Sequence, residues 1–299
     1  MILQPPIGAY IGRNTKEQFG REKILSYGKH PFNDAIIDAC RLEEFRGSPG
    51  PKNMLDLKCG PGKLSLEIIF PYYEELRRQN PGEYPPVEMY FNDAREGPLR
   101  VLEENGHAGH IICCAVEDLP LQEPFRKYDG IIERYGLKES AGQEIIEREM
   151  TAVSYVLKDT GIFVLGEMTA YSDATRESAE YVHGTKHGLA GRDLETEGMP
   201  TILKPDQWKK SLVRAGFTDI TEHGRFTSNV ETRQWEGQYG KEKQKEKEAM
   251  TAIMNRTILM EAEKNPAFKE EFNVRSEMVD GIQIVRLDFP ISVISARIW

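Results

Sequence analysis

The sequence has few cysteines, no long apolar run and no excess of basic residues. Its four cysteines include no Cys-x-x-Cys pair, so we expect reduced thiols rather than a disulfide framework or a zinc site. No stretch approaches the roughly 18 consecutive apolar residues typical of a membrane-spanning helix. The first residues also lack the basic and apolar segments of a signal peptide. We therefore predict a cytoplasmic protein that does not cross a membrane.

Acidic residues outnumber basic ones, 48 to 39, which gives a net charge of −9. A protein that binds nucleic acid needs clustered Lys and Arg to neutralise phosphates, and no basic stripe stands out. We therefore predict no nucleic-acid partner. The length of 299 residues suits one large domain with additions, and 39% hydrophobic residues suffice for a core of its own.

Short apolar runs alternate with helix-periodic segments over residues 53–223. This order predicts a doubly wound α/β fold, in which helices cover both faces of a mostly parallel sheet. Two late apolar runs predict closing strands, and we expect a seven-stranded sheet with an antiparallel edge strand. The expected strands are 53–58, 87–92, 110–115, 128–133, 161–168, 217–223, 282–287 and 291–298, and the expected helices between them are 63–79, 98–105, 142–158 and 205–215.

Polar or glycine-rich residues follow each of the first three expected strands. In an open α/β sheet, ligands bind beyond the carboxyl ends of the strands. Glycines after the first strand let the backbone turn sharply and approach a ligand, a carboxylate after the second can accept hydrogen bonds from ribose hydroxyls, and an acidic turn after the third can border an adenine. The three segments are Asp56-Leu-Lys-Cys-Gly-Pro-Gly62, Asn92-Asp93 and Val116-Glu117-Asp118.

Two other phosphate-binding motifs fit the first segment poorly. A P-loop requires Gly-x-x-x-x-Gly-Lys-Ser/Thr, but Leu57 and Leu64 stand at its first and last positions. The dinucleotide fingerprint requires a third Gly or Ala where this chain has Ser65, and its acidic residue should come sooner than Asp93 does.

These segments resemble the motifs of class I S-adenosylmethionine-dependent methyltransferases, particularly their small-molecule branch. LDLKCGPG resembles the family's LDxGCGxG, CAVEDLPL its adenine-side AEDLPF, and YDGIIERYGL its fourth-strand motif. KPDQWKKSLVRAGFTDI resembles a late helix and strand of the same branch, so the resemblance spans about 53–223. It implies a Rossmann-like fold and the cofactor S-adenosyl-L-methionine. The cofactor-binding residues that it implies are Asp56, Lys58, Cys59, Gly60, Gly62, Asn92, Asp93, Val116, Glu117, Asp118 and Glu133.

The resemblance assigns a role to three groups of these residues. The glycine loop with Asp56 would shape the methionine side, Asp93 would hold the ribose, and Glu117 or Asp118, with Val116, would border the adenine. The first motif departs from the family because Lys58 replaces its usual glycine. A side chain there could crowd the loop or alter the methionine end. PPVEMYFND also resembles a stretch of plant-type carboxyl methyltransferases, which keeps carboxylates among the acceptors.

The family places its substrate lid after the fifth strand, here at about 170–204. That segment contains His183 and His187, whose spacing of four puts both on one face of a helix. They are candidates for a base or a substrate-orienting pair, or alternatively for two exposed lid residues. No third donor is evident beside this pair, so no metal is predicted. Tyr135 is a third catalytic candidate, and Arg134 could hold an anionic substrate. The alternative for these two is a core tyrosine and an ion pair.

We thus expect an N-terminal helical cap over 1–50, a Rossmann-like core over 51–225, and a charged helical insertion with closing strands over 226–299. Apolar residues from Met250 to Met260 could pack on the cap or on a partner subunit, which leaves a homodimer open. The predicted function is methyl transfer to an oxygen, nitrogen or carbon of a small molecule. The alternatives are a non-methylating binder of the same cofactor, such as a cyclase, isomerase or interaction subunit, and a macromolecular methyltransferase, which the acidic charge disfavours.

Overall fold

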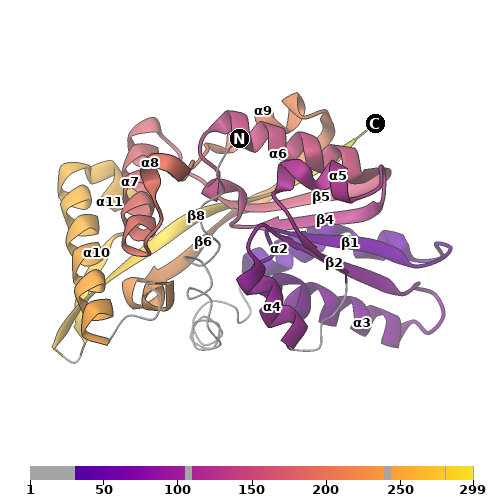
Figure 1. Ribbon diagram of the computed structural model, residues 1–299, viewed down its shortest axis with the longest axis horizontal. Helices are drawn as coiled ribbons and strands as arrows, with labels where there is room; N and C mark the ends of the chain where they lie inside the picture. The colour runs from indigo at the N-terminus through magenta and orange to yellow at the C-terminus, as the bar shows by residue number, and fades with distance from the viewer. Residues whose placement is uncertain (1–30, 105–109, 239–243, 280, 299) are drawn as a thin grey trace.

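The computed structural model describes residues 31–104, 110–238, 244–279 and 281–298. Their strands form one eight-stranded sheet in the order β3-β2-β1-β4-β5-β8-β6, with β7 paired to β8 (Figure 1). The strands are β1 (Lys52–Leu57), β2 (Val87–Asp93), β3 (His110–Cys113), β4 (Tyr128–Arg134), β5 (Leu157–Met168), β6 (Phe217–Glu231), β7 (Arg275–Val279) and β8 (Ile282–Ile298).

The helices lie between these strands and after β6. The α-helices are α2 (Pro31–Cys40), α3 (Phe70–Gln79), α4 (Glu96–Glu104), α5 (Leu119–Gln122), α6 (Gln143–Val156), α7 (Asp173–Leu189), α8 (Leu194–Glu197), α9 (Pro205–Arg214), α10 (Gln244–Lys264) and α11 (Pro266–Glu271). The shorter turns are η2 (Leu42–Phe45), η3 (Ser65–Ile69), η4 (Val116–Asp118), η5 (Leu137–Glu139) and η6 (Thr232–Gln238).

The sheet confirms the predicted doubly wound fold. Strands β3, β2, β1, β4 and β5 are parallel, whereas β8 is antiparallel to both β5 and β6. Because β1 lies between β2 and β4, the chain order reverses beside β1, and the carboxyl ends of these strands border the expected ligand crevice. The sheet has eight strands rather than the predicted seven. The two late runs form the single strand β8, and β7, which was not predicted, pairs with it.

Successive side chains of the inner strands point to opposite faces of the sheet, and each face has its own hydrophobic core. Leu55, Ile131 and Phe163 face the layer of α5, α6 and α9, whereas their neighbours Met54, Ile132 and Val164 face α2, α3 and α4. A strand that is buried on both faces needs apolar residues at successive positions, which explains why these strands read as continuous apolar runs. Each such side chain contributes about 1.5–3 kcal/mol when it is fully buried.

A third hydrophobic cluster extends the sheet on one side. The far halves of β6 and β8 project beyond β5, and α7, α10 and α11 pack against them (Figure 1). Trp235, Phe272 and Phe289 contribute its rings, and Ala179 and Val182 join it to α7. The expected lid segment and the C-terminal segment therefore share one core. The predicted domain boundaries stay predictions.

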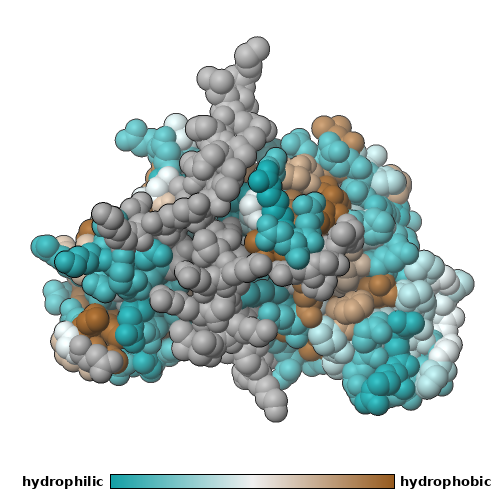
Figure 2. Space-filling view, turned by 60° about the horizontal axis from the view of Figure 1, so that its bottom comes forward, coloured by the Kyte–Doolittle hydropathy of each residue, from teal (hydrophilic) through white to brown (hydrophobic). Residues whose placement is uncertain are grey.

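The described part of the predicted cap, α2, packs on the sheet, where Ile36 is fully buried. The rest of that prediction, residues 1–30, lies outside the described residues. On the face shown in Figure 2, hydrophilic residues cover much of the described surface and hydrophobic residues form separate patches. Among the described helices, none combines the length and the apolar character needed to cross a membrane.

Candidate cofactor and active site

The glycine loop turns sharply between β1 and η3. Gly60 and Gly62 have φ angles of 56° and 71°, a region that glycine adopts at little cost. A Cβ on Gly62 would stand 2.7 Å from Leu102, so this glycine lets the loop pack on the sheet layer below. No described residue lies within 4 Å of the position of a Cβ on Gly60. Within the described part of the chain, the loop thus leaves space beside Gly60 for a ligand to approach the backbone.

Asp93 joins the end of β2 to this loop. Its Oδ2 accepts a hydrogen bond of 3.0 Å from the Gly60 amide. The Arg95 guanidinium binds the same carboxylate through both oxygens, at 2.8 Å and 2.9 Å, and it holds the pKa of Asp93 below its ordinary value even though the carboxyl is buried. Asp93 is therefore a fixed anion at the predicted position, and a ribose would have to share it with Arg95.

Asp56 lies buried under the loop. Its Oδ2 accepts a 2.6 Å hydrogen bond from the Ser65 hydroxyl. Burial is the largest influence on its carboxyl and raises its pKa from 3.8 to about 6. A buried carboxylate at this position favours a nearby positive charge, which fits the methionine end of the expected cofactor.

Asp56→Asn should make the protein more stable at pH 8. Because the folded state raises this pKa, Asp56 stabilises the fold fully below pH 3.8 and loses that contribution as the pH rises through about 6. The difference corresponds to roughly 3 kcal/mol, and asparagine can still accept from Ser65. Urea unfolding at pH 5 and pH 8 measures the effect. An equal difference between variant and wild type at both values would contradict it.

Lys58 takes a φ of 48° at the position where the family has glycine. Its ammonium forms an ion pair of 2.7 Å with Glu149 on α6 and donates to the Ser140 hydroxyl at 2.7 Å. A Cβ on Gly136 would lie 2.6 Å from the Lys58 Cβ. The Lys58 side chain therefore fits because residue 136 is a glycine. The Lys58 ammonium is held by Glu149 on α6.

Two further predicted residues hold the loop to its neighbours. The Cys59 amide donates to the Asn92 carbonyl at 2.8 Å. The side-chain amide of Asn92 donates to the carbonyls of Ile112 and Cys114, which ties β2 to the end of β3. The Asn92 Oδ1 is buried and has no hydrogen-bond partner among the described residues.

The predicted adenine side follows β3. Val116 is buried, whereas Glu117 and Asp118 are exposed on η4. Glu117 accepts a 2.7 Å hydrogen bond from Arg148 on α6. The structure thus places an apolar residue beneath this turn and two carboxylates on its surface.

Glu133 and Glu167 form a buried carboxyl pair at the ends of β4 and β5. Glu133 accepts hydrogen bonds from the amides of Gly136 and Leu137, and Glu167 accepts at 3.0 Å from the Lys138 amide. Burial, followed by the charge of Glu167, raises the pKa of Glu133 well above 4.5. The negative charge of Glu167 therefore opposes ionisation of the buried Glu133 carboxyl.

The other candidates after β4 turn toward α2. Tyr135 has a φ of 64°, and its ring packs edge-on against Phe32 with 5.9 Å between centroids. Arg134 donates to the Asn33 side chain at 3.1 Å. Among the described residues, both side chains therefore contact α2, which agrees with a role in packing.

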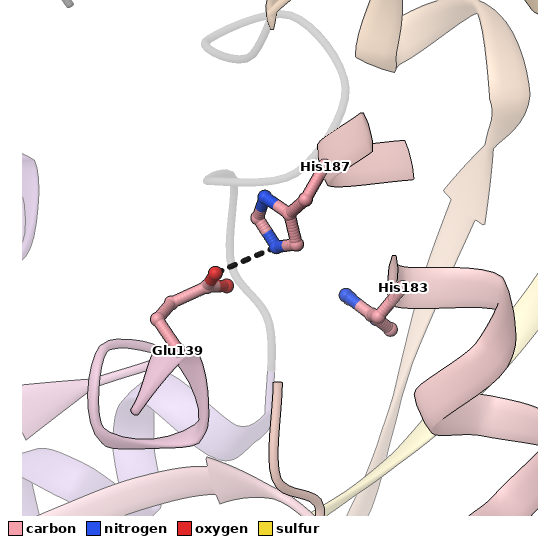
Figure 3. Close-up of side chains that lie close together, drawn as sticks. All are labelled: Glu139, His183 and His187. Carbon is pink, nitrogen blue, oxygen red and sulfur yellow. Dashed lines mark ion pairs between the residues drawn. The ribbon is translucent and has the colours of Figure 1, made fainter. Parts of the chain in front are cut away.

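His183 and His187 lie on one face of α7, as their spacing predicts, and their rings are 6.2 Å apart. The hypothesis of two exposed lid histidines is wrong, because His183 is only 4% exposed and the side chain of His187 only 14%. His187 Nε2 lies 2.6 Å from Glu139 Oε2, and Figure 3 shows the three side chains converging on one space. Burial lowers the pKa of His187 to about 4, so its ring is neutral at pH 7.

The sequence analysis missed Glu139, Glu167 and Lys138. Glu167 ends the fifth strand, so the rule that located Asp56 and Asp93 at strand ends would have found it. Glu139 lies five residues beyond the end of β4, on η5, and no local pattern connects it to α7. Burial of Lys138 among three carboxylates also follows only from the tertiary fold.

A groove of about 550 Å³ lies elsewhere, between η6, α10 and the start of β8. It is lined by Glu231, Arg233, Gln234, Glu236, Gln244, Glu248, Thr251, Ala252, Asn255, Ile282 and Gln283. None of the predicted site residues is among them, so the groove is separate from the strand-end site.

The sequence matches no family profile and no curated protein. Solved structures do resemble it. YcgJ from Bacillus subtilis has a TM-score of 0.63 at 16% identity, over 89% of this chain and 97% of that one. A protein from Bacillus halodurans assigned as a methyltransferase has a TM-score of 0.57 at 17% identity, over 87% of this chain and 98% of that one.

A third neighbour is phosphoethanolamine N-methyltransferase 2 of Haemonchus contortus, in complex with S-adenosyl-L-methionine. Its TM-score is 0.52 at 12% identity, over 98% of this chain and 57% of that one. The chain therefore has the fold of the class I S-adenosylmethionine-dependent methyltransferases. The resemblance noted from the motifs and the likeness of the fold agree.

Proposed function

We propose that this protein transfers a methyl group from S-adenosyl-L-methionine to an oxygen, nitrogen or carbon atom of a small molecule. One observation carries the proposal: the Asp93 carboxylate at the end of β2 binds the Gly60 amide of the glycine loop after β1. The fold, the open space at Gly60 and the buried Asp56 carboxyl support it.

The residues present fit the cofactor. Asp93 would accept from the ribose, the Gly60 backbone and Asp56 would border the methionine end, and Val116 with Glu117 or Asp118 would border the adenine. The cofactor supplies an activated methyl group on a sulfonium, so the protein has to bind, align and exclude water. His183 or His187, neutral because both are buried, would take a proton from an oxygen or nitrogen acceptor.

Calorimetric titration with S-adenosylmethionine and S-adenosylhomocysteine, after removal of any copurified ligand, tests the first half of the proposal. Micromolar binding of both is the expected result, and absence of binding to either would overturn it. Transfer of labelled methyl groups to a panel of small carboxylates, phenols and amines tests the second half.

Replacing His183 or His187 by alanine should lower turnover more than it lowers cofactor affinity. Each ring belongs to α7, which contributes none of the residues predicted to bind the cofactor. Loss of a general base typically reduces the rate about 10²–10⁴-fold. Steady-state turnover and calorimetric affinity, measured on the same variants, separate the two effects. Wild-type rates in both variants would make these histidines bystanders.

The second candidate function is binding of the same cofactor without methyl transfer. Lys58 favours it, because this side chain occupies a position that is glycine in the family motif and is anchored on Glu149. Cofactor binding without transfer to any acceptor would support this function. Lys58→Gly would then show whether the side chain prevents turnover.

A further inference from the structure

Three donor side chains from two separate parts of the chain meet beside the β4 end of the sheet. One ligand atom of each of Glu139, His183 and His187 lies within 4.8 Å of the other two. Figure 3 shows Glu139 approaching from η5 and the two histidines from α7. Two imidazoles and one carboxylate are the donor set that zinc and ferrous sites use.

The supporting elements hold these donors in place. Helix α7 begins with a capping box, in which the Ser172 hydroxyl accepts from the Thr175 amide. Ala179 and Val182, on the same helix, are fully buried in the third hydrophobic cluster. Glu139 ends η5, whose Leu137 is fully buried in the first core. The donors are therefore mounted on packed elements.

His183 has no hydrogen-bond partner for either ring nitrogen among the described residues. Its ring is 4% exposed and packs edge-on against Phe289, at 5.2 Å. Burial of a polar group without a hydrogen-bond partner is unfavourable. A ligand for one of these nitrogens would remove that cost, and His183 lies within reach of the other two donors.

We propose that Glu139, His183 and His187 bind one divalent transition-metal ion of the zinc or ferrous class. Each imidazole offers a ring nitrogen and Glu139 a carboxylate oxygen, and these ligand atoms already lie close together. The carboxylate completes three protein donors, which leaves coordination positions open for water or substrate.

The neighbouring cations fit this choice of ion. Lys138 Nζ lies 3.0 Å from Glu139 Oε1, where it orients the carboxylate and leaves Oε2 toward His187. Arg192 approaches Glu139 at 3.4 Å but is paired with Glu197 at 2.8 Å. Glu139 is the one carboxylate that the described residues contribute to this group of donors, so magnesium and calcium, which take mainly oxygen donors, are poor candidates. Imidazole donors favour zinc and iron.

The ion would lie near the proposed cofactor site, because the charge of Glu139 acts on Arg95, the partner of Asp93. With both imidazoles bound, the ion takes the place of a free histidine base: an open position on it would take an oxygen atom of the methyl acceptor, orient it and favour loss of its proton. This orienting role rests on the proposed methyl transfer, whereas metal binding does not.

Metal binding is tested on the full chain, stripped of metals by a chelator and without S-adenosylmethionine. Zinc titration by calorimetry should give one ion per chain. His183→Ala, His187→Ala and Glu139→Gln should each weaken binding at least about tenfold. His110→Gln is the matched control, because that side chain is 56% exposed on β3 and should leave binding unchanged. Circular dichroism confirms that each variant folds.

A measurement on the wild type alone keeps the proposal falsifiable if a variant does not fold. Cobalt absorption and zinc-edge X-ray absorption distinguish nitrogen and oxygen ligands from thiolates. Two nitrogen donors and no sulfur support the site. Thiolate ligation would assign the ion to the cysteines, and equal binding by the variants and wild type, or no saturable binding in the micromolar range, would also overturn the proposal. If the separate titration detects no binding of S-adenosylmethionine, the conclusion about metal binding does not change.

Discussion

Asp93→Ala should abolish binding of S-adenosylmethionine at micromolar concentrations. In the proposed site this carboxylate accepts from the ribose, and hydrogen bonds to a charged group contribute about 1.5–3 kcal/mol each. Since each 1.4 kcal/mol is about tenfold in affinity, loss of two such bonds weakens binding roughly 100-fold or more. The same change releases the Gly60 amide and disorders the loop contact. Calorimetric titration measures the loss, and unchanged affinity in a folded variant would overturn the ribose assignment.

Arg95→Ala is the matched control. Arg95 occupies both oxygens of Asp93 in this structure. If the ribose takes the place of Arg95, removal of the guanidinium should keep or raise the affinity for the cofactor. A loss as large as that of Asp93→Ala would instead mean that the ion pair, rather than the carboxylate alone, builds the site.

Glu133→Ala should destabilise the fold strongly, whereas Glu133→Gln should not. Alanine leaves the buried amides of Gly136 and Leu137 without their acceptor, at about 1–3 kcal/mol for each amide. Glutamine keeps an acceptor for both amides and can donate its own amide to Glu167. We expect the alanine variant to lose roughly 2–6 kcal/mol of unfolding free energy and the glutamine variant to lose less than about 1 kcal/mol.

The pH dependence separates the two contributions of Glu133. The folded state raises its pKa above 4.5, so the stabilisation that its protonated form provides is lost as the pH rises through the folded value. Glu133→Gln removes this loss and should gain stability relative to wild type as the pH increases. Denaturant unfolding of the wild type and of both variants at pH 6 and pH 9 measures how each free energy of unfolding changes with pH. Equal stability of the two variants would mean that the amide contacts contribute little.

The strand-end chemistry was predictable because it depends on neighbours in sequence. Asp56 and Asp93 lie at the carboxyl ends of buried strands and Gly60 follows the first of them, and a parallel sheet brings such ends to one edge. The same reasoning predicted that His183 and His187 share a helix face. It could not predict that both would be buried, because Trp235 and Phe289, which pack against His183, are far along the chain, and so is Glu139, which contacts His187.

The predictions that failed concern long-range pairing. The sequence shows two apolar runs before and after Pro290, and a proline usually ends a strand. Strand β8 continues through it, because β5 and β6 pair on either side and the Pro290 carbonyl accepts from the Thr169 amide. Strand β6 likewise extends to Glu231, beyond the predicted end at 223, because β8 gives it a partner over that length.

By itself the sequence determined the doubly wound order of strands, the glycine loop and the carboxylate after the second strand, because periodicity and turn chemistry are local. Only the tertiary structure decided which side chains share the site. It set Lys58 against Glu149, paired Glu133 with Glu167, and brought Glu139 to the two histidines of α7. These contacts join residues that are separated along the chain, and packing of the helices on the sheet fixes their distances.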